Sequence, residues 1–183
     1  MASAFTHAFS ALALGTLFPK KYHSGYYWFW GMFCAVFPDA DVIGFKFGIP
    51  YGHVLGHRGL THSFFFALIF AFIIVAVFFR KHNFFGKGWW IILGYLFVCT
   101  ASHGVLDAMT TGGKGIAFFA PFENGRYFFP DEFRRLRVSP IGIQHFFGEW
   151  GIRVMKSEFL WVWIPCIFVM LSAAFVRLIG GRK

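Results

Sequence analysis

The sequence predicts an all-α integral membrane protein, a bundle of about five helices with an aromatic and basic cap at one membrane interface. Three observations support this prediction. Of the 183 residues, 57% are hydrophobic and only 14% are charged, which lies outside the usual range of soluble domains. Phenylalanine alone contributes 29 residues. Short turns of Gly, Pro, Lys and Arg separate the apolar stretches, as in helical membrane proteins. We expect residues 1–183 to form one membrane-embedded domain.

The first two apolar segments, residues 4–18 and 26–37, are shorter than the roughly 20 residues that a spanning helix needs. Each is predicted to be a helix that crosses a locally thinned bilayer, that is tilted, or that is only partly immersed. Segment 4–18 does not resemble a secretory signal, because no positive charge precedes it and Lys20 and Lys21 follow it. It is therefore expected to be a retained first helix.

Three further segments are predicted to span the hydrocarbon core, namely residues 63–79, 89–109 and 159–179. Between the last two lies segment 110–157, which is rich in Phe, Tyr and Trp. These aromatic side chains would be costly to leave in water. Segment 110–157 is therefore predicted to be an interfacial cap on the lipid headgroups.

If all five segments cross the bilayer, the junctions after the first, third and fifth share one side. Basic residues gather at these junctions: Lys20, Lys21, Arg80, Lys81, Lys87, Arg177, Arg182 and Lys183. The positive-inside rule makes that side cytoplasmic and puts the loop 39–61 on the outer face. Segment 110–157 holds seven Lys or Arg residues, which opposes the assignment, but long loops weigh less in this rule.

The formal charge of +9 does not indicate nucleic-acid binding, because no zinc-finger, helix-turn-helix or RNA-binding signature accompanies it. Membrane anchoring accounts for much of this charge. Cys34, Cys99 and Cys166 lie far apart inside apolar segments. They indicate neither a CxxC metal site nor a disulfide framework.

Seven histidine and aspartate residues fall at one membrane face in this topology: His7, Asp39, Asp41, His57, His62, His103 and Asp107. The strongest pair is His103 and Asp107, whose i, i+4 spacing stacks two metal-ligand side chains on one helical face. Placing ionisable side chains within or just below the headgroup region costs free energy unless they pair with one another or coordinate an ion. The alternative for this pair is a mutual hydrogen bond that only pins two helices.

Two loop motifs supply the remaining candidates. In Phe-Pro-Asp-Ala-Asp, Asp39 and Asp41 follow a predicted helix C-terminus, where the macrodipole disfavours negative charge unless an ion or an arginine compensates. A solvated turn is the alternative. The motif His-Arg-Gly-Leu-Thr-His-Ser, residues 57–63, combines two imidazoles and a guanidinium before a spanning segment, with Thr61 as the expected N-cap. His7 by itself indicates only an interfacial anchor. It becomes a candidate metal ligand because the other histidines and aspartates are expected at the same membrane face.

Carboxylates and imidazoles without a thiolate suit zinc, or else manganese, as one or two ions. The expected ligands are His7, Asp39, Asp41, His62, His103 and Asp107. A bound ion can activate water and polarise a phosphoryl or acyl oxygen. Asp39 and His57 are the candidate catalytic groups, because an uncoordinated carboxylate or histidine serves as the general base. No Gly-x-Ser-x-Gly elbow supports a serine hydrolase.

Together these motifs resemble the YdjM-like family of membrane-bound metal-dependent hydrolases. The resemblance runs from residue 6 to about residue 165 and also includes Ala-Pro-Phe and Gly-Arg-Tyr within 115–127, Ser139-Pro140, and segment 157–165. It implies a hydrolase of the bacterial inner membrane, and it does not itself establish a substrate. The helical His-x-x-x-Asp pattern is also faintly similar to zinc-dependent phospholipase C, an analogy that favours phosphoester chemistry.

Arginine side chains fit a phosphate-bearing substrate, because guanidinium groups bind phosphate bidentately. Arg58 and Arg126 lie inside motifs and are the candidate substrate-binding residues. Glu158 is interpreted as a carboxylate at the start of the last span, where the helix dipole favours it, with a supporting role beside a ligand as the alternative.

The sequence thus predicts a metal-dependent hydrolase on the outer face of the membrane, acting on a phosphoester of a membrane lipid or a lipid-linked substrate. Membrane lipid is the expected partner and nucleic acid is not. The alternative is a non-catalytic membrane protein whose structural ion site serves partner binding or transport.

Overall fold

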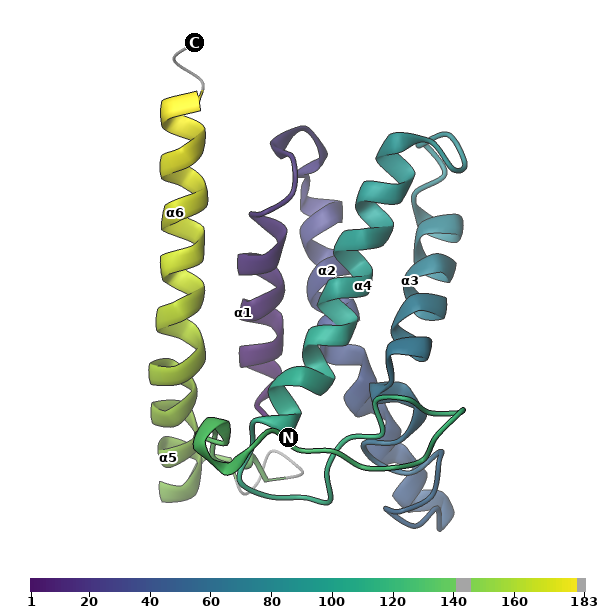
Figure 1. Cartoon of the computed structure of the whole chain (residues 1–183), viewed down its shortest axis with the longest axis vertical. Coiled ribbons are helices and arrows are strands. Elements are labelled where there is room, and N and C mark those ends of the chain that lie inside the picture. The colour runs from purple at the N-terminus through teal and green to yellow at the C-terminus, as the bar shows by residue number, and fades with distance from the viewer. Residues whose placement is uncertain (141–145, 181–183) are drawn as a thin grey trace.

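The computed structural model describes residues 1–140 and 146–180, which form a helical bundle (Figure 1). Its long helices are α1 (Ala4–Gly15), α2 (Gly25–Val36), α3 (Phe64–Phe78), α4 (Lys87–Ala108) and a last helix over Glu149–Gly180. The last helix joins α5 (Glu149–Glu158), a π-helical turn (Phe159–Trp163) and α6 (Ile164–Gly180). Within the described residues two isolated β-bridges occur but no strand. The predicted all-helical bundle of about five helices is confirmed.

Within the part of the chain that the structure describes, two helices, not three, are long and apolar enough to cross a membrane: α4 with 22 residues and Glu149–Gly180 with 32. The prediction of a firm third span over 63–79 is wrong. Helix α3 has only 15 residues, or about 22 Å at 1.5 Å per residue. It is short because Ser63 is its N-cap, accepting a hydrogen bond from the backbone N–H of Phe66 at 3.0 Å. The predicted cap at Thr61 is therefore also wrong. Helices α1 and α2 have 12 residues each and are short, as predicted, although α1 ends three residues before the predicted segment 4–18 does.

The last helix begins at Glu149, ten residues before the predicted start of the span at 159. No proline interrupts residues 149–164, so the helix runs unbroken through the π-helical turn into α6. The C-terminal part of the predicted cap is consequently helical. The irregular part, from Thr110 to Pro140, passes under the helix ends and buries Ile116 and Leu136 while exposing Phe119 and Phe122.

Aromatic packing between α2 and α4 lies in the core, which α1 and α3 also line. The rings of Tyr27 and Tyr95 stack with centroids 4.0 Å apart. Their hydroxyls donate to backbone carbonyls of α1, that of Gly15 at 3.1 Å and that of Ala11 at 3.3 Å, so neither buried hydroxyl is left unpaired. A Cβ on Gly31 would lie 1.8 Å from the hydroxyl oxygen of Tyr95. Glycine is therefore required at this crossing of α2 and α4.

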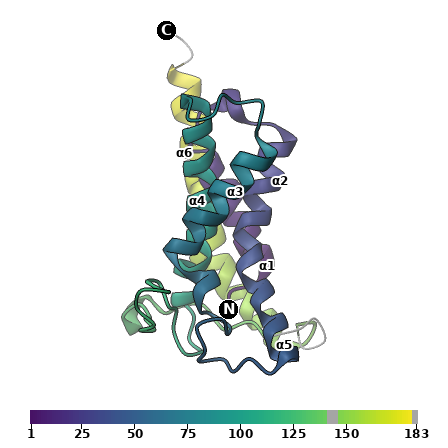
Figure 2. The same ribbon diagram turned by 90° about the vertical axis from the view of Figure 1, so that its right-hand side faces the viewer.

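The chain reverses direction at each connection, so the bundle has two distinct ends (Figures 1 and 2). One end, here called the site end, holds the N-terminus, the α2–α3 connection, segment 110–140 and α5. The other, here called the basic end, holds the α1–α2 and α3–α4 connections and the C-terminal turn of α6. This grouping agrees with the predicted topology. Arg182 and Lys183, which were counted among the basic residues of one side, lie outside the described residues.

Candidate metal centre

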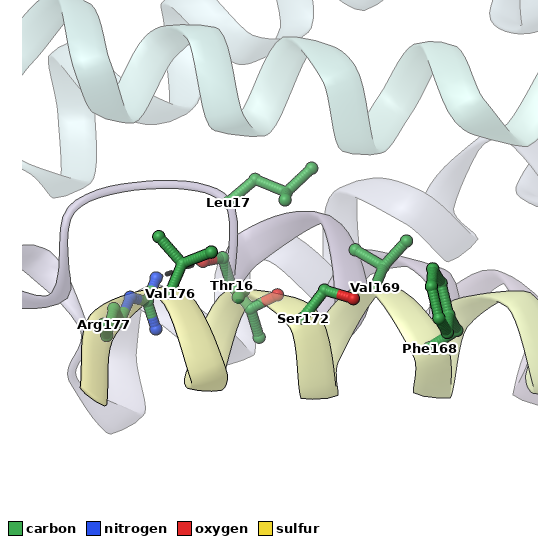
Figure 3. Close-up of a pocket in the computed structure, with 8 residues that line it drawn as sticks. Thr16, Leu17, Phe168, Val169, Ser172, Val176 and Arg177 are labelled. Atoms are coloured by element: carbon green, nitrogen blue, oxygen red, sulfur yellow. Dashed lines mark hydrogen bonds between the residues drawn. The ribbon is translucent and has the colours of Figure 1, made fainter. Parts of the chain in front are cut away.

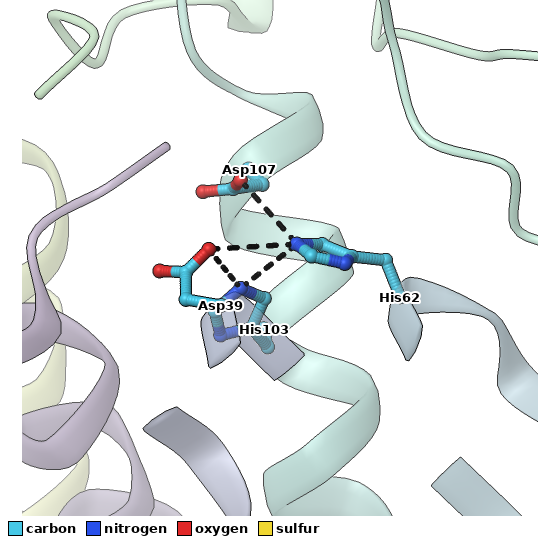
Figure 4. A group of neighbouring side chains, drawn as sticks. All are labelled: Asp39, His62, His103 and Asp107. Carbon is cyan, nitrogen blue, oxygen red and sulfur yellow. Dashed lines mark hydrogen bonds and ion pairs between the residues drawn. The ribbon is translucent and has the colours of Figure 1, made fainter. Parts of the chain in front are cut away.

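Four side chains from three parts of the chain converge at the site end (Figure 4). Asp39 lies on the 3-10 segment that follows α2 (Phe37–Phe47), and His62 lies on the 3-10 turn before α3 (Leu60–His62). His103 and Asp107 lie on α4, one turn apart. All four are buried, and one possible ligand atom from each lies within 4.8 Å of the others. The predicted convergence of these four residues is thus present in the structure.

The ligand atoms have separations that suit a single ion. His103 Nε2 lies 3.1 Å from His62 Nε2 and 3.2 Å from Asp39 Oδ1. His62 Nε2 lies 3.6 Å from Asp39 Oδ1 and 3.9 Å from Asp107 Oδ2. A tetrahedron of zinc bonds of about 2.0–2.2 Å has edges of roughly 3.4 Å. Two nitrogens and two carboxylate oxygens therefore surround a volume of the size of one divalent ion.

Unpaired buried polar atoms mark the same place. In residues 1–140 and 146–180, eight buried side-chain nitrogen or oxygen atoms have no hydrogen-bond partner. Two are the indole nitrogens of Trp30 and Trp89, and all the others belong to His7, Asp39, Arg58 and Asp107. Of these, Arg58 Nε and Asp107 Oδ2 form an ion pair at 3.1 Å without the alignment of a hydrogen bond. Leaving such groups unpaired in a protein interior costs free energy, and most so for charged groups. A bound cation would satisfy the carboxylates of Asp39 and Asp107, so the residues present fit a metal ion.

The second nitrogen of each histidine ligand is held by the protein. His103 Nδ1 lies 2.7 Å from the carbonyl oxygen of Ala35. A carbonyl only accepts, so this nitrogen carries the proton and Nε2 presents its lone pair to the cluster. His62 Nδ1 lies 3.0 Å from the hydroxyl oxygen of Thr61 and 3.3 Å from Asp41 Oδ2. Such partners orient imidazole ligands in metal sites.

The electrostatics of the loop residues favour a cation. Burial would raise the pKa of Asp39, but the nearby imidazoles of His103 and His62 hold the pKa of this carboxyl well below its usual range. Burial would lower the pKa of His62, yet the adjacent carboxylates of Asp39 and Asp41 raise this pKa to about 9. The negative field that keeps a proton on His62 also attracts a divalent ion, whose binding would release that proton.

Asp41 supports the cluster from behind His62 and does not face its centre. Its Oδ1 accepts from His57 Nδ1 at 2.7 Å, and its Oδ2 accepts from the hydroxyl of Thr61 at 2.6 Å and from the backbone N–H of Arg58 at 3.2 Å. Burial opposes its charge, but the hydrogen bonds from His57 and His62 hold the pKa of Asp41 well below its usual range. Asp41, His57 and His62 form a second group whose ligand atoms lie within 4.8 Å of one another.

Replacing Asp41 by asparagine is expected to weaken metal binding by about 10- to 100-fold, because partners that orient a histidine ligand contribute about this much. Competition of the purified variant against a chromophoric chelator would measure the change. Glu132→Gln is the matched control, since Glu132 is an exposed carboxylate at the same end of the bundle. Equal affinities of the Asp41→Asn variant and the wild type would contradict the orienting role.

His7 lies at the edge of the cluster. Its ring stacks on that of His103 with centroids 3.8 Å apart, and its Nε2 lies 3.6 Å from Asp107 Oδ1. Both ring nitrogens are buried and unpaired. The structure therefore brings His7 beside the four residues, although α1 contributes no atom to the group within 4.8 Å.

Arg58 is wholly buried and faces Asp107. Its Nε lies 3.1 Å from Asp107 Oδ2, and its Nη atoms donate to the carbonyl of Gly112 at 2.9 Å and to the hydroxyl of Thr110 at 3.1 Å. Its backbone φ is +64°, a conformation that non-glycine residues rarely adopt. A Cβ on Gly113, whose own φ is +92°, would lie 2.3 Å from Arg58 Nη1. The guanidinium is therefore fitted closely between the cap and the candidate ligands.

Arg126 is half-buried and bonds mainly to backbone. Its Nη atoms donate to the carbonyls of Tyr51 at 3.0 Å and His57 at 3.1 Å, and its guanidinium lies over the ring of Tyr51, 5.5 Å from the centroid. It thus joins segment 110–140 to the loop before α3. The substrate-binding role predicted for Arg58 and Arg126 stays a prediction.

Several supporting groups were not found from the sequence. The carbonyl of Ala35 gives no residue-specific signal, whereas the hydroxyl of Thr61 could have been suspected because it adjoins His62. The assignment of Glu158 to a helix start is wrong, since the helix begins at Glu149. Glu158 instead accepts hydrogen bonds from the backbone N–H and the hydroxyl of Ser3, both at 2.5 Å, and from Thr6 at 2.7 Å. It fastens the last helix beside His7.

Comparison with known proteins agrees with the membrane assignment. The family model described as YdjM inner membrane protein matches residues 1–182. The chain is 37% identical over 175 residues to the inner membrane protein YbcI of Escherichia coli (strain K12), an alignment that covers 93% of this chain and 95% of that protein. No solved structure matches the chain.

Proposed function

Because the chain belongs to the YdjM inner membrane protein family, we propose that it is a membrane-embedded metal-dependent hydrolase of the bacterial inner membrane. The single observation that supports this most is the buried group of Asp39, His62, His103 and Asp107, whose ligand atoms lie within 4.8 Å of one another. Two imidazole nitrogens and two carboxylate oxygens suit zinc best, with manganese as the second choice. One ion fits this group. The group of Asp41, His57 and His62 would accept a second ion only in place of the general-base role of His57.

A divalent ion at this position supplies Lewis-acid polarisation and a lowered pKa of water. The protein supplies the proton acceptor. His57 is the proposed general base, because its Nδ1 is held by Asp41 at 2.7 Å and its Nε2 stays available. Asp39 is the candidate ligand with the most exposed side chain, 10% against 0% for the other three. We place the approach of the substrate on the side of Asp39.

The proposed substrate is a phosphoester of a membrane lipid or of a lipid-linked compound. Arg126 is better placed for its phosphate than Arg58, since Arg126 is half-buried while Arg58 is buried and engaged with Asp107. Exposed aromatic side chains such as Phe119 and Phe122 surround the site end and suit contact with the lipid interface. The basic residues at the opposite end support a site on the outer face.

The zinc-loaded protein is expected to release labelled phosphate or headgroup from phosphatidylglycerol or from a polyprenyl diphosphate in detergent micelles. His57→Ala is expected to lower the rate by about 10²- to 10⁴-fold, the usual contribution of a general base, while the bound metal stays. His53→Ala is the control, because His53 lies in the same loop and is exposed. No turnover of either lipid class by zinc- or manganese-loaded protein would refute the hydrolase.

The burial of all four candidate ligands favours a second candidate, a non-catalytic membrane protein with a structural ion site. Structural zinc sites are closed by four protein ligands, whereas catalytic sites keep one open position. The cluster joins α4 to the segments that follow α2 and precede α3, so an ion there would hold the bundle together. Chelation separates the two candidates: loss of helical content and of the melting transition indicates a structural ion, and loss of turnover with the fold retained indicates a catalytic one.

A further inference from the structure

Charge is distributed very unevenly between the two ends of the bundle. All eight Asp and Glu residues of the chain lie in segments of the site end. The basic end carries Lys20, Lys21, Arg80, Lys81, Lys87 and Arg177. The chain therefore provides no carboxylate side chain to balance these cations, and an external anion must do so.

One of these cations sits at the mouth of an apolar groove between α1 and α6 (Figure 3). The groove has a volume of about 400 Å³. Its polar lining residues are Arg177, Ser172 and Thr16, the last of which donates its hydroxyl to the carbonyl of Ala13 at 2.6 Å. Its apolar lining residues are Leu17, Phe168, Val169, Ala173 and Val176. Both hydrogen bonds that the structure shows for Arg177 come from Nη2, which donates to the carbonyls of Thr16 and Phe18. The guanidinium is thus fixed in place with donors left for a ligand.

The groove continues toward the middle of the bundle. A second cavity of about 290 Å³ shares Leu17 and Val169 with the first and extends between α1, α4 and α6. Its only hydroxyls are those of Ser10 and Ser102, and both are bonded to carbonyls of their own helices, at 2.8 Å each. The continuation therefore offers an apolar surface without free hydroxyl donors.

The last helix is attached in a way that leaves this space open. No residue of α6 is buried. Polar contacts hold the last helix near both ends, Glu158 with Ser3 and Thr6 at the site end and Arg177 with the turn that follows α1 at the basic end. Between them, side chains of α6 do not fill the gap against α1 and α4.

We propose that this groove binds one anionic glycerophospholipid, with the phosphate at Arg177 and one acyl chain along α1 and α6. A cation and the hydroxyl of Ser172 suit a phosphate group, and the apolar floor between α1 and α6 suits an acyl chain. A free phosphate would leave the floor empty, and the uncompensated positive charge favours a lipid with a net negative headgroup. The site lies at the opposite end from the metal cluster and does not depend on the proposed hydrolase.

Native mass spectrometry of the whole protein in detergent, titrated with palmitoyl-oleoyl phosphatidylglycerol or with palmitoyl-oleoyl phosphatidylcholine, tests the proposal. One phosphatidylglycerol is expected to stay bound, with an affinity at least tenfold above that for phosphatidylcholine. Arg177→Gln should abolish this preference by removing the cation. Ala173→Phe should lower the binding of both lipids about tenfold by filling the groove while leaving Arg177 in place.

Arg80→Gln is the matched control, because Arg80 is an exposed cation of the basic end outside this groove. Its affinity for phosphatidylglycerol should equal that of the wild type. Equal binding of the two lipids by the wild-type protein would overturn the proposal without any variant. Unchanged binding in folded Ala173→Phe protein, or an equal loss in Arg80→Gln and Arg177→Gln, would overturn it as well.

Discussion

Asp107→Asn protein is expected to retain less than a tenth of the metal that the wild-type protein binds. The substitution keeps the size of the side chain but removes the negative charge, and an amide is a much poorer ligand than a carboxylate for zinc. It also leaves the Arg58 guanidinium, 3.1 Å away, as a positive charge without its partner beside the site. Elemental analysis after dialysis against zinc-containing buffer, normalised to protein concentration, gives the occupancy.

His62→Ala is expected to cause a loss of similar size, because His62 Nε2 lies between the nitrogen of His103 and the carboxylates of Asp39 and Asp107. His53→Ala is the control for loss of an imidazole from the same loop, since His53 is exposed. It should retain full occupancy. Wild-type occupancy in both the Asp107→Asn and His62→Ala proteins would show that these residues do not bind the ion.

Removal of Arg58 is expected to have the second large effect, on stability. Arg58→Ala leaves Asp107 without its closest cation and removes the guanidinium hydrogen bonds to the carbonyl of Gly112 and the hydroxyl of Thr110. Breaking a buried ion pair by deleting one partner costs about 3–5 kcal/mol. The melting temperature of the metal-free protein should fall by roughly 10 °C. Circular dichroism in detergent would measure the transition.

The backbone of Arg58 provides a control for this experiment. Because its φ is +64°, alanine retains the unfavourable left-handed conformation and glycine does not, so Arg58→Gly should be more stable than Arg58→Ala by about 1 kcal/mol. Bound zinc should reduce the loss of stability in both variants, since the ion replaces the lost positive charge beside Asp107. A melting temperature of Arg58→Ala within 2 °C of the wild type, with or without zinc, would contradict the role given to the pair.

The candidate site was more predictable than the lengths of the helices. His103 and Asp107 could be placed on one face because the helical repeat fixes side chains four residues apart. The order of the apolar segments then brought Asp39 and His62 to the same end. Helix ends were less predictable, because an apolar run in the sequence can continue past the residue at which the helix ends. Segment 63–79 is accordingly two residues longer than α3. The last helix begins ten residues before the predicted span, at Glu149, because its first residues are polar and do not belong to the apolar run.

Composition and the spacing of apolar segments by themselves determined that this chain is a helical membrane protein with seven of its histidine and aspartate residues at one end. They could do so because lipid burial requires runs of apolar residues and because the helical repeat fixes which nearby residues share a face, and both can be read from short stretches of sequence. Only the tertiary structure decided which of these residues face one another: Asp39, His62, His103 and Asp107 around a common point, Asp41 behind His62, and Arg58 against Asp107. Side-chain direction and packing between distant segments set these contacts, and no local pattern encodes them.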